Sequence, residues 1–177
     1  IKEIGNQMNR KQVDGFKLED LSKLNFVKGQ DKLSFLHYIE KAVRKNFPEM
    51  LTFIKEFSLL QETARVPIDQ LTADVNMYIQ SVNNVQKSME SGNLSDPKKF
   101  HPDDDILANL KPHLPAALAK CALLDVQHQA IVKSFDKLMR YYAEDPSDEL
   151  ARSTFVLKFL DFANDFKRAH KENIETE

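Results

Sequence analysis

The side chains that could do chemistry are few, and their spacing does not suit a catalytic or metal site. The five histidines, His37, His101, His113, His128 and His170, are scattered without the short spacings typical of metal ligands. The run HPDDD, from His101 to Asp105, has its carboxylates where the start of a helix attracts negative charge, so a structural cap is favoured over a metal site. We therefore expect no metal and no cofactor.

The single cysteine, Cys121, lies beside alanine and leucine in a helix-like stretch with no histidine at a telling distance. A buried, unreactive thiol is favoured there over a nucleophile. The sequence also lacks a phosphate-binding loop, a nucleophile elbow and a paired-carboxylate motif. These observations predict a protein that is not an enzyme.

Composition narrows the class of protein. The 177 residues are 42% hydrophobic and 29% charged, which suits a chain that buries a core. The net charge of −2 gives no broad electrostatic reason to expect nucleic acid or an anionic membrane as a partner. One cysteine and no long apolar run favour a reduced cytosolic compartment and no transmembrane segment. Because the first residue is Ile1, we expect a fragment whose N-terminus is missing.

The elements that must position any functional residue are predicted to be helices throughout, an all-α fold. Only four glycines occur, and no stretch alternates apolar and polar residues as a strand does. Asp31 is a candidate N-cap for a helix with an apolar stripe that includes Leu36 and Val43. Pro48 and Pro67 each suit the first position of a helix, where the missing amide has no partner to lose.

A long helix is predicted over residues 67–91, ending at Gly92 in a left-handed conformation. Its apolar residues recur three and four apart and form a narrow coiled-coil seam, namely Ile68, Leu71, Val75, Tyr78, Val82, Val85 and Met89. Such a helix needs a partner. We expect upstream helices that are absent from this chain to provide it.

The C-terminal part, residues 92–177, is predicted to hold the remaining helices. Pro112 and Pro115 are expected to interrupt the first helical region there. Either Ser147 or Asp148 can cap the last helix. That helix has one aromatic edge, made of Phe155, Phe159, Phe162 and Phe166. The chain then divides into residues 1–66, the long helix 67–91 and residues 92–177.

Two motifs near the start permit two interpretations. The stretch GNQMN has the pattern Gly5-Asn6-x-Met8-Asn9, and GFKLEDLSKL begins at Gly15 and Phe16. The simpler interpretation is a helix end with Asn9 as a turn residue. The other is a receiving surface, in which glycine permits close backbone approach, asparagine offers amides and methionine offers an adaptable apolar wall.

Taken in order with FVKG, LSFLHYIEKAV, FPEML and the long helix, these motifs resemble the C-terminal half of the formin homology-two domain. This domain is the actin-assembly module of formins, and the motif residues are similar to those of fungal members. The resemblance runs from about Ile4 to about Lys171, and the connectors Arg10 to Asp14 and Gly29 to Leu33 are shorter than the family's usual loops. It covers the part that the family calls the post, together with the returning coiled-coil helix.

The resemblance implies an all-helical dimer in which an N-terminal lasso of each subunit encircles the post of the other. Such dimers nucleate unbranched actin filaments and stay processively on the growing barbed end. The implied partners are actin, a second formin subunit, and profilin-actin through regions outside this chain. The implied location is the cytoplasmic cytoskeleton, at the cell cortex or at sites of polarised growth, division and cytokinesis.

The resemblance also assigns roles to residues. It places Gly5, Asn6, Met8, Asn9, Gly15 and Phe16 on the post surface that receives the partner's lasso. Lys28 matches the family's actin-contacting lysine, and Lys32 is a second candidate. From the residues alone, a solvated loop lysine is the favoured interpretation of Lys28. The alternative function is a helical-bundle scaffold or tether without actin activity, which has no need of GNQMN or of Lys28.

Overall fold

The computed structural model describes residues 12, 15–29, 32–92, 94, 98, 101 and 103–176. Every extended regular element in this part of the chain is a helix, and the β pairing there is an isolated bridge between Lys28 and Ser34. The all-α prediction is therefore confirmed. None of the helices described combines the length and apolarity that crossing a bilayer requires. The chain forms two compact units, residues 1–67 with 138–177 and residues 68–137.

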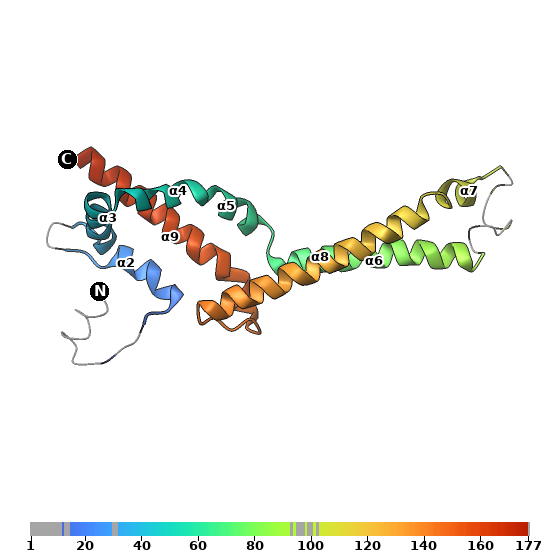
Figure 1. Ribbon diagram of the computed structural model, residues 1–177, viewed down its shortest axis with the longest axis horizontal. Coiled ribbons are helices and arrows are strands. Elements are labelled where there is room, and N and C mark those ends of the chain that lie inside the picture. Colours follow the sequence, from blue (N-terminus) through green and yellow to red (C-terminus); the bar gives the residue numbers. More distant parts are fainter. Residues whose placement is uncertain are drawn as a thin grey trace. The chain divides into compact units, whose positions relative to one another are not determined.

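The first unit is built around one long C-terminal helix, α9 (Glu149–Thr176), drawn in red in Figure 1. Helix α9 packs against α3, α5 and η1. The shorter elements of this unit are η1 (Leu18–Ser22), α2 (Lys23–Phe26), α3 (Phe35–Asn46), η2 (Pro48–Thr52), α4 (Phe53–Glu56) and α5 (Ser58–Arg65).

The core of the first unit lies between α3 and α9. Leu36, Phe166 and Ala169 are buried at its centre, and partly buried side chains pack around them: Leu24, Ile39, Val43, Leu51, Phe53 and Phe162. The Phe53 ring meets Phe166 edge to face, with centroids 5.1 Å apart. Nearer the start of α9, the rings of Phe155 and Phe159 pack edge to face, with centroids 5.3 Å apart. The predicted aromatic edge of the last helix is confirmed.

The start of α3 differs from the sequence prediction. The helix begins at Phe35 with Ser34 in the N-cap position, whereas Asp31, the predicted cap, lies outside the described residues. The reason is local: Lys32 has a positive φ of 64°, and Ser34 is bridged to Lys28, so both belong to a turn rather than to a helix. The prediction for Pro48 is confirmed, since it opens η2.

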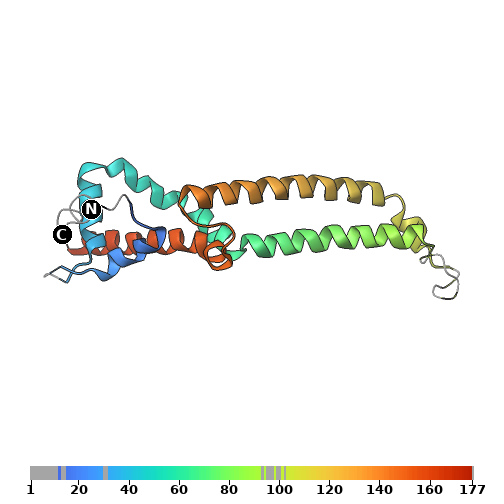
Figure 2. The ribbon, with the colours of Figure 1, turned by 90° about the horizontal axis from the view of Figure 1, so that it is seen from below.

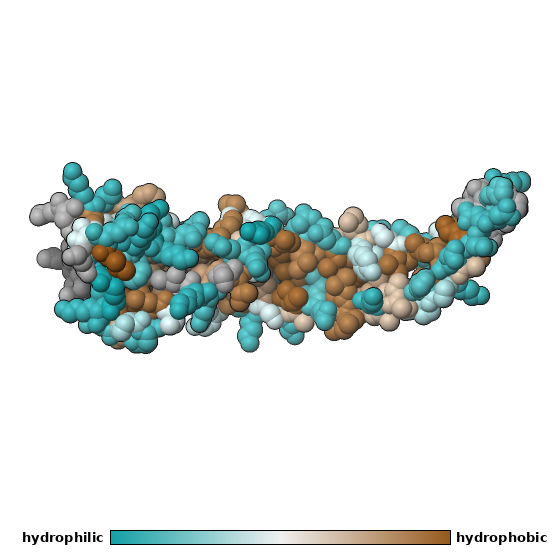
Figure 3. All heavy atoms as spheres, turned by 90° about the horizontal axis from the view of Figure 1, so that it is seen from above, coloured by the Kyte–Doolittle hydropathy of each residue, from teal (hydrophilic) through white to brown (hydrophobic). Residues whose placement is uncertain are grey.

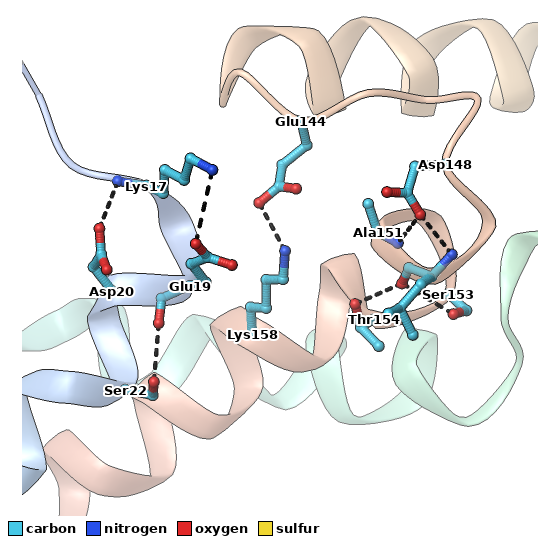
Figure 4. Close-up of polar contacts among 11 residues, drawn as sticks. Lys17, Glu19, Asp20, Ser22, Glu144, Asp148, Ala151, Ser153, Thr154 and Lys158 are labelled. Atoms are coloured by element: carbon cyan, nitrogen blue, oxygen red, sulfur yellow. Dashed lines mark hydrogen bonds and ion pairs between the residues drawn. The ribbon is translucent and has the colours of Figure 1, made fainter.

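The start of α9 resolves the choice between the two candidate caps. Asp148 Oδ1 accepts hydrogen bonds from the backbone amides of Leu150 (2.9 Å) and Ala151 (3.0 Å), as Figure 4 shows. Ser147 instead donates its hydroxyl to Asp145 Oδ1 at 2.7 Å. Hydrogen bonds from the Ser147 backbone amide and then its hydroxyl hold the pKa of Asp145 below its ordinary value. Asp148 is therefore the cap.

The second unit is a pair of long helices, α6 (Ile68–Glu90) and the greater part of α8 (Leu114–Tyr141). They lie side by side in Figures 1 and 2, and Thr72 Oγ1 lies 2.9 Å from His128 Nε2. Val75 of the predicted seam is buried, as is Cys121. Helix α8 of the same chain thus covers part of the seam, whereas Tyr78 and Val85 of the seam remain exposed. The expectation that upstream helices pair with the seam stays a prediction.

Two further predictions concern the ends of these helices. Gly92 has φ of 71°, which confirms the left-handed residue expected after α6. Pro112 lies between α7 (Ile106–Leu110) and α8, but Pro115 does not interrupt a helix, because α8 begins one residue before it. In the first turn of a helix the missing proline amide has no partner to lose, so α8 tolerates it.

Candidate functional site

The predicted actin-contacting lysine lies in a short closed loop between α2 and α3. The amide of Gly29 donates to the carbonyl of Leu33 (2.9 Å), and the amide of Phe35 donates to the carbonyl of Val27 (2.7 Å). Lys28 and Ser34 form the isolated antiparallel bridge between these two hydrogen bonds. We call residues 27–29 and 32–35 the Lys28 loop. Its described backbone is ordered by main-chain hydrogen bonds, independently of the lysine side chain.

The surface of this loop combines apolar and cationic side chains. Phe26, which immediately precedes the loop, is 78% exposed, and Val27 is also exposed. Lys28 and Lys32 are both exposed as well, so the structure places the two predicted lysines on one loop. Exposed aromatic side chains beside lysines are typical of a surface that binds an acidic partner with an apolar groove.

Beneath the loop lies a polar contact that the sequence did not predict. Ser34 is only 3% exposed, and its Oγ lies 2.7 Å from Nδ1 of His37. Nε2 of the same histidine lies 2.7 Å from Oε2 of Glu172 on α9. The sequence holds a weak signal for the first pair, the spacing of three at a helix start, but none for the second.

A second polar cluster lies one turn farther along α3, centred on Glu40, which is 0% exposed. Its carboxylate accepts hydrogen bonds from Arg44 Nε (3.0 Å), from His170 Nδ1 (2.6 Å) and from the Asn173 amide. Asn173 also donates to the carbonyl of His37 at 2.9 Å. A buried carboxylate with three donors is well satisfied, so this cluster fixes α3 against α9.

The contact chain Ser34, His37 and Glu172 has the residue types of a hydrolase triad, but not its accessibility. The serine hydroxyl is buried under the loop and serves as the N-cap residue of α3, so no substrate can reach it. Within the described part of the chain, no three His, Cys, Asp or Glu side chains gather as metal ligands would. These contacts therefore have a structural role, since they join the start of α3 to α9.

The residues predicted to receive a lasso are only partly described. Gly5, Asn6, Met8 and Asn9 lie outside the described residues. A Cβ on Gly15 would meet nothing within 4 Å, and Phe16 is 68% exposed. These two residues lead into η1, so η1 and α2 separate them along the chain from the Lys28 loop.

The start of η1, next to Phe16, is held by the side chain of Asp20. The amide of Lys17 donates to Asp20 Oδ2 at 3.0 Å, as Figure 4 shows. Lys23 Nζ donates to Asp20 Oδ1 (2.5 Å). The hydrogen bond from Lys23, followed by that from the Lys17 amide, holds the pKa of Asp20 below its ordinary value. Lys17 also lines an open hollow together with Tyr142, Glu144 and Lys158. In Figure 4, Lys158 reaches Glu144 at the edge of this hollow, with a distance of 2.7 Å.

Comparisons with known proteins agree on one family. A model described as the Formin Homology 2 Domain matches residues 1–167. The chain is 41% identical to Protein BNI1 of Saccharomyces cerevisiae over 98% of its length, and 39% identical to Formin BNR1 of Candida albicans over all of it. It is 36% identical to Cytokinesis protein sepA of Emericella nidulans, also over all of its length. The matched regions make up only 9%, 12% and 10% of these three relatives.

Proposed function

The chain belongs to the formin homology 2 domain family, and on that premise we propose that it is an actin-binding module. Acting as a dimer, it nucleates unbranched filaments and stays processively on the growing barbed end. The observation that carries the proposal is the match of the family over residues 1–167, which include the Lys28 loop.

The Lys28 loop supports contact with actin. Actin is acidic, and its barbed-end groove accepts apolar and basic groups. The loop offers Lys28 and Lys32 beside exposed Phe26 and Val27. Main-chain hydrogen bonds already join the described residues on either side of Lys28 and Ser34, so little backbone entropy is lost there when Lys28 meets a partner. Lys28 is proposed as the principal contact and Lys32 as an accessory one.

Dimerisation is proposed to use the segment before η1. Gly15 has open space around it, and Phe16 is a large exposed aromatic side chain, as expected for a surface whose partner is absent. Gly5, Asn6, Met8 and Asn9 complete this lasso-receiving surface in the proposal. The hollow beside Lys17 gives an inserted side chain from the second subunit a place to pack.

Two further parts of the proposal concern the cell. Profilin-actin is delivered through regions outside this chain. The site of action is the actin cytoskeleton at the cell cortex, at places of polarised growth and division. The name of the sepA relative refers to cytokinesis, and the BNR1 relative is named a formin.

Replacing Lys28 in the full-length protein tests the actin contact. A charge-assisted hydrogen bond lost at one site corresponds to roughly a thirtyfold change in affinity, so nucleation by Lys28→Ala should fall by at least that factor. Pyrenyl-actin assembly measures nucleation, and filament microscopy measures dwell on barbed ends. Lys133→Ala, at an exposed position on α8, is the matched control and should behave like the parent. Equal activity of Lys28→Ala and the control would refute the contact.

Replacing Met8 tests the dimer surface. Met8→Asp places a charge where the lasso is proposed to pack, so sedimentation equilibrium of the full-length protein should show monomers. Lys28→Ala should remain a dimer, because an exposed loop lysine contributes little to packing. If the Met8→Asp variant still forms dimers, GNQMN is only a helix end and not a dimer surface. Actin assembly at the parental level by both variants would favour the helical scaffold instead.

A further inference from the structure

We propose that Ser34, His37 and Glu172 are positioning residues, which anchor the Lys28 loop to helix α9 and so hold Lys28 ready for actin. The inference rests on the proposed function, since it takes Lys28 as the actin contact. None of the three residues is proposed to touch actin. They act through the backbone of the loop.

The first step of the argument is that the backbone of Lys28 is placed by Ser34. The two residues are bridge partners, and the flanking hydrogen bonds from Gly29 to Leu33 and from Phe35 to Val27 close the loop on either side of them. A displacement of Ser34 would therefore be transmitted directly to Lys28. The Lys28 side chain is exposed, so the backbone pairing with Ser34, rather than packing of the side chain, fixes where Lys28 lies.

The second step is that Ser34 is held from beneath. Its hydroxyl lies 2.7 Å from His37 Nδ1, and Nε2 of that ring lies 2.7 Å from Glu172 Oε2, although Glu172 is 135 residues away in the sequence. When His37 donates from Nε2 to the carboxylate, its Nδ1 accepts a hydrogen bond from the Ser34 hydroxyl. The carboxylate thus holds the ring in the orientation that meets the serine.

The third step is that the backbone of α3 that carries the ring is itself tied to α9. Asn173, next to Glu172 on α9, donates to the His37 carbonyl at 2.9 Å. One turn farther along, Glu40 accepts from His170 and from Asn173, which joins α3 to α9 a second time. Buried polar pairs of this kind add little net stability compared with apolar side chains, but they fix one register between two helices. The register is what a precisely placed lysine requires.

Glu172→Gln in the full-length protein is the most informative variant, because the Glu172 side chain is 49% exposed and its replacement leaves the buried core intact. Glutamine is uncharged, so its hydrogen bond to the ring is weaker than that of the carboxylate, and the ring that meets Ser34 is less firmly held. We expect about a fivefold loss in pyrenyl-actin nucleation, as is typical for one weakened hydrogen bond. Glu175→Gln is the matched control on the same helix, since Glu175 is 63% exposed and pairs only with Lys171 in the described contacts.

A double-mutant cycle with Lys28→Ala separates positioning from a general structural role. If Glu172 acts through Lys28, Glu172→Gln causes no further loss when Lys28 is already alanine. Additive losses would overturn the inference and leave the actin contact of Lys28 standing. Parental activity of Lys28→Ala would overturn the proposed contact and the inference together.

Hydrogen exchange supplies a readout that does not depend on actin. In Glu172→Gln and in Ser34→Ala, the amides of Gly29 and Phe35 should exchange about five times faster than in the parent, because the loop they close is less firmly held. Glu175→Gln should leave both rates unchanged. Unchanged rates in Glu172→Gln would refute the anchoring directly, whatever its effect on actin assembly.

Discussion

The two units of this chain use long helices in different ways. In the first unit, α9 is surrounded by shorter helices, and large side chains such as Phe155 and Phe166 are fully buried with a polar network beside them. In the second unit, α6 and α8 pack mainly against each other. Among the described residues of this unit, only Val75 and Cys121 are buried. Convergent packing from several directions fixes one arrangement, whereas a single helix pair leaves much of each helix uncovered.

The uncovered part of the second unit is itself apolar. Leu123, Val126 and Ile131 of α8 are all exposed. Figure 3 shows apolar side chains gathered along the α6 and α8 part of the molecule. The first unit also exposes apolar residues, but Phe26 and Val27 there flank the proposed actin contact. In the first unit the proposed contact thus lies beside a buried core, whereas the helix pair exposes apolar residues on a helix with few buried neighbours.

The largest effect should come from removing a core ring of the first unit. Phe166→Ala should lower the free energy of unfolding of that unit by about 3–5 kcal/mol, because it leaves a cavity between α3 and α9. Val75→Ala in the second unit should cost only about 1–2 kcal/mol, since fewer groups surround it. Native-state hydrogen exchange, followed separately in α9 and α6, measures both. If Phe166→Ala lowers protection equally in both helices, the two units unfold together and the contrast fails.

An intermediate effect should come from the exposed strip on α8. Residues 1–177 should self-associate through it, because burying each apolar side chain contributes about 1–2 kcal/mol. Replacing both Leu123 and Val126 with lysine should shift sedimentation velocity profiles toward the monomer. Gln129→Lys is exposed but off the strip, and it should sediment like the parent. If unsubstituted residues 1–177 are already monomeric, the exposed apolar residues of α8 do not drive self-association.

The smallest effect on stability concerns Asp20 of the first unit, whose side chain holds the start of η1. Its pKa is below the ordinary value of 3.8, chiefly because Lys23 donates to it, so this contact stabilises the fold at neutral pH. As pH falls below 3.8 and through the folded pKa, the carboxylate is protonated and that contribution is lost. The amide of Lys17 should then exchange faster. In Asp20→Asn, exchange at Lys17 should show no such acid-induced step after correction for intrinsic rates; a step of parental size would contradict the assignment.

The sequence alone determined the elements that depend on neighbours within a turn or two. Pro48 and Gly92 have backbone preferences that any fold must respect, and the spacing of Phe155 to Phe166 marks a buried helix face. The type and order of the motifs were enough to identify the family. Lys28 was found because its motif is contiguous, and its exposed position on a loop agrees with that prediction, although the hydrogen bonds that close the loop were not predicted.

Only the tertiary structure decided which distant residues meet. His37 and Glu172 are separated by 135 residues, and each alone has the pattern of a solvated polar side chain, so no local signal predicts their hydrogen bond. The same applies to the partner of the α6 seam: a heptad pattern states that a helix must be paired, but it does not name the partner. The start of α3 at Ser34 rather than Asp31 is a local matter by comparison, because the positive φ of Lys32 and the bridge between Lys28 and Ser34 set where that helix begins.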